Sequence, residues 1–289
     1  MIKKIHRNYY AVIGNPIKHS YSPRIHNLFS EQFNLHIKYE LLLATRTNLF
    51  DNIKKFIESG GKGLNITVPF KEEIFKSLIK CNGNISKHAS LAKSVNTLYF
   101  TKNGEWHGHN TDGIGFIKDL YLKNIALKGS KVLLIGAGGA ARGILGPLSE
   151  EGCEHIHIVN RTSEKAQEIC QFVNQYTDQR STIISSGNLE SSQQDKWNLV
   201  INATTSSLKN VLPNIPEKIY ADNSTAYDMM YGINDTIFMK NAKRNGAKQC
   251  FDGLGMLVLQ AAESFFVWHR IYPNIYPVLT SLRNMPKNL

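Results

Sequence analysis

The sequence lacks the cysteine and histidine spacings that are typical of disulfide-rich or metal-binding proteins. Its 289 residues contain four cysteines, Cys81, Cys153, Cys170 and Cys250, and no two of them form a C-x-x-C pair or a zinc-ligand spacing. The ten histidines also lack a ligand spacing such as H-E-x-x-H, so we expect no metal site. This cysteine usage fits a compartment in which thiols stay reduced.

Long apolar runs are also missing. No stretch approaches the ~18 consecutive apolar residues that a membrane-spanning helix requires. Near the N-terminus, the apolar run over residues 9–13 is too short for the core of a signal peptide. Together with the cysteine usage, these absences lead us to expect a cytoplasmic protein with no membrane partner.

Acidic residues are outnumbered, but the basic residues are not clustered. Lys and Arg total 34 against 23 Asp and Glu, which gives a net charge of +11. Basic chains often bind nucleic acids, acidic membranes or small anions. Here the lysines are scattered, and we find no basic helix and no nucleic-acid-binding motif. We therefore interpret the net charge as mostly a feature of composition that also suits anionic ligands, and we expect no nucleic-acid partner.

From residue 8 onward, segments with the residue pattern of strands alternate with segments that have the pattern of helices. This alternation predicts an α/β fold with a parallel or mixed sheet. The chain is long enough for two domains, or for one large one. Residues 186–196 are instead rich in Ser and Gln, and we expect them to form a loop.

Residues 131–143, KVLLIGAGGAARG, are typical of a dinucleotide-binding turn. Residues 132–135 predict a buried parallel strand, residues 136–141 read G-x-G-x-x-A, and a helix is expected to follow. The first glycine permits a tight turn, the second lets a pyrophosphate approach the backbone, and the small sixth residue lets helix and strand pack closely. We therefore expect a Rossmann-like domain whose helix N-terminus faces the phosphates.

The residues after the next predicted strand, 156–159, favour NADP over NAD. An NAD site usually carries Asp or Glu here, to bind the ribose 2′-hydroxyl. This chain has Asn160-Arg161-Thr162, with Lys165 close behind. A guanidinium can clamp a 2′-phosphate with two charge-assisted hydrogen bonds, whereas a carboxylate would repel it. The alternative is a solvated surface arginine, and the place of Arg161 at the strand tip favours the NADP site.

Two serines lie in the loop after the first predicted strand. Ser20 and Ser22 come just before Pro23, and proline suits the first turn of a helix. Ser22 would be a good N-cap, and its spacing alone favours capping over ligand binding. Ser20 has no such structural role.

Three polar side chains are predicted to meet at the carboxyl end of one strand. Residues 64–68 alternate between apolar and polar, which is the strand period, and a helix begins at Lys71. Asn65, Thr67 and Lys71 would thus converge where open α/β sheets bind ligands.

Further along, Asn96 lies near the start of a predicted strand, and Asp112 precedes a predicted helix. For Asp112, spacing alone gives helix capping and ligand binding equal weight. Gln260 is one of few polar residues in a long apolar helix, and buried polar groups need partners.

Nine short motifs occur between residues 14 and 262, namely GNPIKHSYSP, GGKGLNITVPFKEE, SVNTL, GHNTDGIGF, LLIGAGGAARG, NRT, INAT, YDMMY and DGLGMLVLQAA. In these motifs and in their order, the chain resembles the bacterial shikimate dehydrogenases along nearly its whole length. The resemblance implies reversible NADPH-dependent reduction of 3-dehydroshikimate to shikimate, a step of aromatic amino acid (chorismate) biosynthesis.

The resemblance also implies a domain organisation. An α/β substrate-binding domain with a mainly parallel sheet would comprise residues 1–111 and 252–289, with the C-terminal helices returning to it. A Rossmann-like NADP-binding domain would comprise residues 112–251.

The site residues follow from the same resemblance. Those expected to bind substrate are Ser20, Ser22, Asn65, Thr67, Asn96, Tyr231 and Gln260. Those expected to bind NADP are Gly136, Ala137, Gly138, Gly139, Ala140, Ala141, Asn160, Arg161, Thr162, Lys165, Met229 and Gly253. Lys71 and Asp112 would be catalytic.

Reduction of a carbonyl builds negative charge on its oxygen, so the site needs a proton donor. Lys71 is our candidate, with Asp112 orienting its ammonium. The proton would come from Lys71 alone or from the coupled pair, since strongly coupled groups titrate together. A lysine beside a carboxylate is more often only a salt bridge, but here the matched motifs favour catalysis.

Two positions depart from the family pattern. The family usually has a glycine near the end of its N-A-T loop, where this chain has Ser206-Ser207-Leu208. Lys165 stands where relatives often carry a second arginine, which implies a weaker grip on the 2′-phosphate. The rival function is a quinate or quinate/shikimate dehydrogenase. A homodimer is compatible with the sequence, which decides neither the oligomeric state nor the tolerance of quinate.

Overall fold

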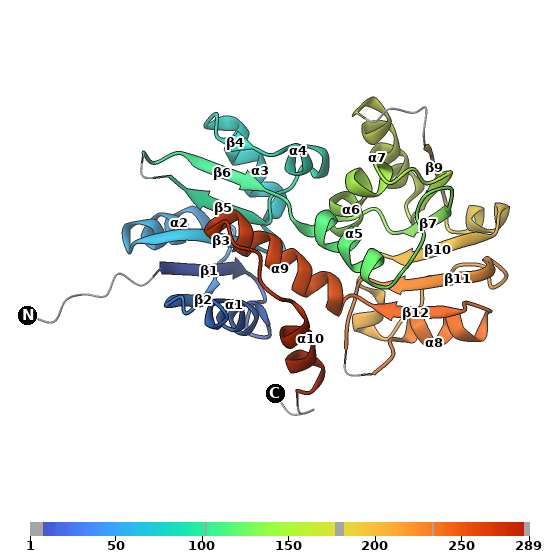
Figure 1. Ribbon diagram of the computed structural model, residues 1–289. Helices are drawn as coiled ribbons and strands as arrows, with labels where there is room; N and C mark the ends of the chain where they lie inside the picture. The colour runs from blue at the N-terminus through green and yellow to red at the C-terminus, as the bar shows by residue number, and fades with distance from the viewer. Residues whose placement is uncertain (1–7, 102, 177–181, 233, 286–289) are drawn as a thin grey trace, which may run out of the picture. The chain divides into compact units, whose positions relative to one another are not determined.

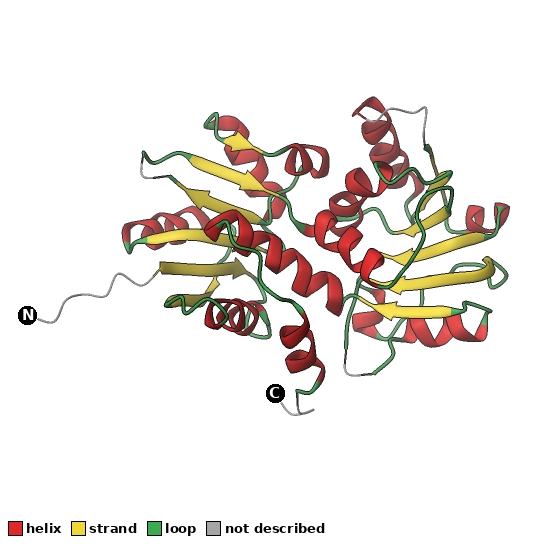
Figure 2. Cartoon of the chain, in the orientation of Figure 1, coloured by secondary structure: helices red, strands yellow, loops and turns green. Residues whose placement is uncertain are grey.

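The computed structural model describes residues 8–101, 103–176, 182–232 and 234–285. Within them the chain forms two compact units, each built on one sheet (Figure 1, Figure 2). The first unit ends at Thr111 and resumes with Val258–Asn284, so the C-terminal helices return to it, and Asp112–Leu257 belong to the second unit. Across these described ranges, no helix is long and apolar enough to cross a membrane.

The first unit contains a mixed six-stranded sheet in the order β2-β1-β3-β5-β6-β4. Strand β1 is parallel to β2 and β3, and β4 is parallel to β6, whereas β5 runs antiparallel to β3 and β6. The strands are β1 Asn8–Gly14, β2 Ile37–Leu43, β3 Gly61–Ile66, β4 Asn84–Ile85, β5 Thr97–Phe100 and β6 Trp106–His109.

Helices cover both faces of this sheet. Alternate residues of β1 point to opposite faces, and the side chains on each face are apolar and pack against helices. Ala11 and Ile13 belong to the apolar cluster that α2, α3 and α4 complete. On the other face, Tyr10 stacks on Trp268 of α9 at 4.7 Å between ring centroids. The helices are α1 Ser22–Glu31, α2 Leu49–Glu58, α3 Lys71–Lys80, α4 Lys87–Ala92, α9 Leu254–His269 and α10 Tyr276–Arg283.

The second unit contains a parallel six-stranded sheet in the order β12-β11-β10-β7-β8-β9. Read from β9, this is the doubly wound order 3-2-1-4-5-6, in which the chain reverses direction between β7 and β10. The strands are β7 Lys131–Ile135, β8 His155–Val159, β9 Ile183–Gly187, β10 Trp197–Asn202, β11 Tyr220–Asp228 and β12 Gln249–Asp252. The helices are α5 Asp112–Leu122, α6 Gly139–Ser149, α7 Ser163–Tyr176 and α8 Ile237–Arg244, with 3₁₀ turns at Glu190–Gln194 and Ser206–Lys209.

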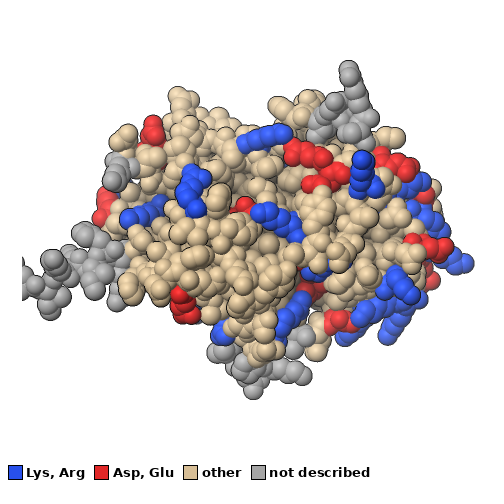
Figure 3. All heavy atoms as spheres, viewed as in Figure 1, with Lys and Arg blue, Asp and Glu red and all other residues tan. Residues whose placement is uncertain are grey.

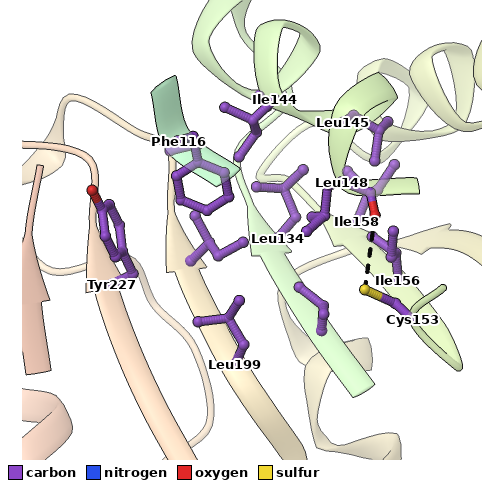
Figure 4. Close-up of a cluster of buried hydrophobic side chains, with 14 of the residues drawn as sticks. Phe116, Leu134, Ile144, Leu145, Leu148, Cys153, Ile156, Ile158, Leu199 and Tyr227 are labelled. Atoms are coloured by element: carbon purple, nitrogen blue, oxygen red, sulfur yellow. Dashed lines mark hydrogen bonds between the residues drawn. The ribbon is translucent and has the colours of Figure 1, made fainter. Parts of the chain in front are cut away.

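The core of the second unit explains why β7 reads as a continuous apolar run. Leu134 packs among side chains of α5, α6 and α7, including Phe116 and Ile144 (Figure 4). Leu133 faces the other side of the sheet, with Phe238 of α8. All of these side chains are at most 1% exposed. Burying one such side chain contributes roughly 1.5–3 kcal/mol to folding.

Part of the loop expected at residues 186–196 forms regular secondary structure. It contains the end of β9 and a 3₁₀ turn. Polar residues are accommodated at this edge of the sheet because their hydroxyls bond to His157 on β8. Its Nδ1 lies 2.7 Å from Ser185 Oγ, and its Nε2 lies 2.8 Å from Ser191 Oγ. The expectation of a loop was therefore wrong for residues 186, 187 and 190–194, because hydrogen bonds replace apolar packing there.

Charged side chains are interspersed on the surface. On the face drawn in Figure 3, Lys and Arg side chains lie among Asp and Glu side chains and large uncharged areas. Some of these charged side chains form ion pairs. Lys131 Nζ lies 2.6 Å from Asp195 Oδ2, and Lys243 Nζ lies 2.6 Å from Asp235 Oδ2.

A buried histidine makes the first unit sensitive to acid. His26 on α1 is fully buried and stacks on Tyr39 of β2, with ring centroids 4.5 Å apart. Burial lowers the pKa of His26 from 6.5 to about 3, and the nearby His269 acts in the same direction. Below pH 6.5 the unfolded chain therefore binds a proton that the folded chain excludes.

We predict that the stabilising effect of neutral His26 is complete above pH 6.5 and is lost as the pH falls toward 3. Between these limits His26 should contribute a slope of about 1.4 kcal/mol per pH unit to the free energy of unfolding. Urea unfolding from pH 7 to pH 5 measures this slope, and His26→Leu should reduce it by that amount. The control His36→Leu, at an exposed position, should keep the wild-type slope; equal slopes in all three proteins would contradict the prediction.

Candidate active site

The glycine-rich turn lies between β7 and α6, as predicted. Gly136 has φ +112°, which favours glycine, and a Cβ there would lie 3.0 Å from Thr204 Cγ2. Gly138 precedes the first residue of α6 and offers no side-chain cap. A Cβ on Gly138 or Gly139 would meet no heavy atom within 4 Å. Packing of the chain thus leaves open space at this helix N-terminus, which fits a phosphate group.

The alanines of the turn pack inward. Ala141 is fully buried and Ala137 is 7% exposed, and both belong to the core cluster of the unit, against which Ala140 packs. Small side chains here let α6 approach β7 closely.

The residues predicted to select NADP follow the next strand tip. The Gly136 N–H donates to the Val159 carbonyl at 2.8 Å, so the glycine turn and the end of β8 are adjacent. Asn160 Nδ2 donates to the Thr162 carbonyl at 2.8 Å and shapes the loop before α7. Arg161, Thr162 and Lys165 have exposed side chains. Two cations beside the glycine turn fit a cofactor that carries a 2′-phosphate.

Met229 and Gly253 also come together. Met229 is 7% exposed and follows β11, and its N–H donates to the Asn202 carbonyl at 3.0 Å. Gly253 follows β12, and a Cβ there would lie 2.3 Å from the Met229 carbonyl oxygen, so only glycine allows this approach. Both residues thus lie at carboxyl ends of strands, where doubly wound sheets bind ligands.

In the first unit, Asn65 sits in a buried network of hydrogen bonds. Its Oδ1 accepts from the Tyr39 hydroxyl at 2.6 Å. Its Nδ2 lies 3.2 Å from Thr97 Oγ1 and 3.0 Å from Ser264 Oγ. Because Asn65 is 8% exposed, these bonds fix the orientation of its amide.

Asn96 continues the network toward α9. Its Nδ2 donates to Thr111 Oγ1 at 2.8 Å and to Gln260 Oε1 at 3.4 Å, and its Oδ1 accepts from the Thr111 N–H at 2.9 Å. Thr111 Oγ1 also donates to the Gln260 carbonyl at 2.9 Å. Asn65, Asn96 and Gln260, which the resemblance assigns to the substrate, thus lie in one hydrogen-bond network within the first unit.

Lys71 and Asp112 begin helices beside this network. Lys71 is the first residue of α3, and its carbonyl accepts from the Val95 N–H at 3.0 Å, next to Asn96. Asp112 directly follows Thr111, is 7% exposed and is itself the first residue of α5. Among the described residues, no group of three or more His, Cys, Asp and Glu side chains could hold a metal ion.

Ser22 does not cap α1. It is the first helical residue, and the residue at the cap position, Tyr21, makes no side-chain cap bond. Ser20 takes the expected role instead, because its Oγ accepts from the Ser22 N–H at 3.3 Å. The Ser20 hydroxyl also donates to Ser22 Oγ at 3.1 Å, so the two predicted ligand hydroxyls are adjacent.

The remaining predicted substrate residues are Thr67 and Tyr231. Thr67 is half-buried beyond the end of β3, and its N–H donates to the Ile13 carbonyl at 3.0 Å. Tyr231 is half-buried and belongs to the second unit, two residues after Met229.

Four members of the network, Ser264, Tyr39, Thr97 and Thr111, were not among the site residues expected from the sequence. Ser264 is fully buried and joins Asn65, Thr97 and Gln260, with its Oγ 2.7 Å from Thr97 Oγ1. Its position four residues after Gln260, on the same helix face, was an available signal. Burial raises the pKa of Tyr39 well above 10, so its hydroxyl stays protonated and donates to Asn65. Tyr39 carries no comparable signal in the sequence.

The strand order, the glycine turn and the cations at the tip of β8 define the class: an NADP-dependent oxidoreductase with a Rossmann-type domain. Comparisons with known proteins specify the family. The family described as "Shikimate dehydrogenase substrate binding domain" matches residues 12–98, and "Shikimate / quinate 5-dehydrogenase" matches residues 119–227. The curated "Shikimate dehydrogenase (NADP(+))" of Bordetella petrii is 47% identical over 275 residues, 95% of this chain and 94% of that protein. The chain belongs to the shikimate dehydrogenase family.

Solved structures agree with this assignment. The shikimate dehydrogenase of Aquifex aeolicus matches with a TM-score of 0.84 and 31% identity, over 98% of this chain and 100% of that one. The shikimate 5-dehydrogenase of Thermus thermophilus, in complex with NADP(H) and shikimate, matches with a TM-score of 0.82 and 28% identity, over 96% and 98%. The predicted two-domain α/β fold is confirmed.

We predict that Ser264→Ala lowers the free energy of unfolding by about 1–3 kcal/mol, because Asn65 Nδ2 and Thr97 Oγ1 lose a buried partner. Urea unfolding at constant m-value measures this loss. Ser59→Ala is the matched control, since it removes an exposed hydroxyl that bonds the Lys55 carbonyl at 2.8 Å, and it should change stability by less than about 0.5 kcal/mol. Equal losses of unfolding free energy in the two variants would contradict the prediction that the buried network stabilises the fold more than an exposed hydrogen bond does.

Proposed function

We infer that this chain catalyses the reversible NADPH-dependent reduction of 3-dehydroshikimate to shikimate, in aromatic amino acid biosynthesis. The observation that carries this conclusion is the 47% identity, over 95% of the chain, with a curated NADP⁺-dependent shikimate dehydrogenase. The buried amides and hydroxyls around Asn65 and Asn96 suit a substrate that has several hydroxyl groups. A cytoplasmic location and a homodimer remain predictions.

We assign the substrate to the first unit and NADP to the second, as the sequence predicted. The match of residues 12–98 to a substrate-binding domain supports the first assignment. We propose domain boundaries at residues 112 and 252; the compact units begin and end at Asp112 and Leu257. Since α9 begins at Leu254, that helix runs from one unit into the other.

The second unit would hold NADP through the turn after β7 and the loop after β8. The α6 N-terminus, with its N–H groups and dipole, would bind the pyrophosphate. Arg161 and Lys165 would bind the 2′-phosphate, with Asn160 holding the loop. Met229 and Gly253 would lie near the nicotinamide. When bound, NADPH supplies the hydride.

As the resemblance implies, Lys71 would donate the proton to the carbonyl oxygen, and Asp112 would orient its ammonium group. Both residues begin helices that adjoin the Asn96–Thr111 hydrogen bonds. Asn65, Thr67, Asn96 and Gln260 would bind substrate hydroxyls, and Ser20, Ser22 and Tyr231 would bind the carboxylate. Because internal bonds already orient the Asn65 and Asn96 amides, little ordering remains when substrate binds.

Quinate is the alternative substrate, and the second family description names both compounds. The deciding experiment compares kcat/KM for shikimate and quinate with NADP⁺ and with NAD⁺. We predict that shikimate with NADP⁺ gives the largest value. Arg161→Ala should raise the KM for NADP⁺ about tenfold or more while NAD⁺ kinetics change little, since only NADP⁺ has the 2′-phosphate.

The control for Arg161→Ala is Arg244→Ala, which removes an exposed charge from the last turn of α8. It should leave the preference for NADP⁺ unchanged. Equal losses with both cofactors in Arg161→Ala would contradict the 2′-phosphate assignment, and turnover of quinate alone would contradict the proposed substrate.

We also predict that Lys71→Ala lowers kcat by about 10²-fold or more, the usual size of a general acid contribution, with a small change in the KM for shikimate. Lys76→Ala, an exposed lysine of the same helix, should behave as wild type. A raised KM with normal kcat would make Lys71 a binding residue. A lowered melting temperature with normal kinetics would make it structural.

A further inference from the structure

A fully buried carboxylate lies at the end of β11. Asp228 has no exposed surface, and each of its oxygens accepts two hydrogen bonds. Oδ1 accepts from Asn202 Nδ2 at 3.1 Å and from the Met230 N–H at 3.0 Å. Oδ2 accepts from Ser207 Oγ at 2.6 Å and from Thr236 Oγ1 at 2.6 Å. Burial raises the pKa of Asp228, and these four donors act against that shift by stabilising the carboxylate.

These bonds join three segments of the second unit. Asn202 ends β10, and Ser207 lies in the short turn that follows it. Met230 follows β11, and Thr236 caps α8 by accepting from the Met239 N–H at 3.2 Å. A single carboxylate therefore connects the ends of two neighbouring strands with the start of a helix.

The loop after β10 is folded around the same residues. Asn202 Oδ1 accepts from Thr204 Oγ1 at 2.7 Å, and Thr204 Oγ1 lies 2.6 Å from Ser206 Oγ. The Ala203 N–H donates to the Ile135 carbonyl at 2.8 Å, immediately before Gly136. The loop thus touches the cofactor turn at one end and Asp228, through Ser207, at the other.

We propose that Asp228 is a positioning residue for the nicotinamide end of the cofactor, and that Ser207 is the group through which it holds the loop after β10. This inference rests on the proposed function, because Met229, next to Asp228, is one of the two residues assigned to the nicotinamide. The side chains assigned to the 2′-phosphate follow β8 instead. Loosening the loop should therefore weaken contacts with the nicotinamide and spare those with the 2′-phosphate.

The test uses two ligands that share the phosphates and differ in the nicotinamide. Binding of NADPH and of 2′-phospho-ADP-ribose, which lacks the nicotinamide, is measured by calorimetry with wild type and Ser207→Ala. We expect Ser207→Ala to weaken NADPH binding about fivefold to tenfold, which is the size of the net contribution of one typical hydrogen bond, and fragment binding less than about twofold. Ser207→Thr, which keeps the hydroxyl, should restore NADPH binding.

Asp228→Asn should show the same selective loss if it folds, and Ser207→Ala carries the test if it does not. The control Ser192→Ala removes a buried hydroxyl that bonds the Leu189 carbonyl at 2.7 Å, and it should affect neither ligand. Equal weakening of both ligands, or of neither, in Ser207→Ala would overturn the proposal. Because these titrations need no substrate, a wild-type protein that binds NADPH but does not oxidise shikimate would refute the proposed function and leave this test intact.

Discussion

A buried amide must find hydrogen-bond partners, and this constraint organises the substrate side of the molecule. Asn65 satisfies it with Tyr39 from β2, Thr97 from β5 and Ser264 from α9. Segments that are distant in the chain are thereby held around one side chain. An apolar residue at position 65 would remove these three hydrogen bonds, each of which contributes about 0.5–1.5 kcal/mol to the free energy of unfolding. The same bonds that stabilise the first unit therefore also set the geometry of its binding groups.

On the cofactor side, strand order, glycines and buried hydrogen bonds together shape the binding region. The reversal of strand order between β7 and β10 leaves the carboxyl ends of these strands available for a ligand. Glycines leave space there, since a Cβ on Gly138 or Gly139 would meet no heavy atom within 4 Å. Buried hydrogen bonds to Asp228 order the neighbouring loop. Open space for the phosphates and a fixed loop at the strand ends thus come from separate residues.

Much of this could be predicted from local patterns. The strand predicted at residues 132–135 lies within β7, and the helix predicted to begin at Lys71 does begin there, because local residue patterns determine both elements. NADP, the reaction and the α/β fold agree with the comparisons, because the motifs that carry them are short and contiguous. The roles of the site residues remain predictions, which the variants of Lys71 and Arg161 and a ligand-bound structure test.

Errors arose where long-range contacts decide the structure. Ser22 fitted the N-cap pattern, but Ser20 bonds its N–H and the helix starts one residue earlier. Ser264 and Tyr39 were missed because their partner Asn65 is 199 and 26 residues away in the chain. No local rule detects a hydrogen bond over such a separation.

The most direct test of the account is a crystal structure of the chain with NADP⁺ and shikimate bound. The account predicts shikimate hydroxyls within hydrogen-bond distance of Asn65, Asn96 and Lys71, with the Tyr39–Asn65 bond still present. The 2′-phosphate should contact Arg161, and the nicotinamide should lie beside Met229. A shikimate molecule bound away from the Asn65 network, or an Asn65 amide that turns from Tyr39 on binding, would contradict the claim that internal hydrogen bonds prepare this site.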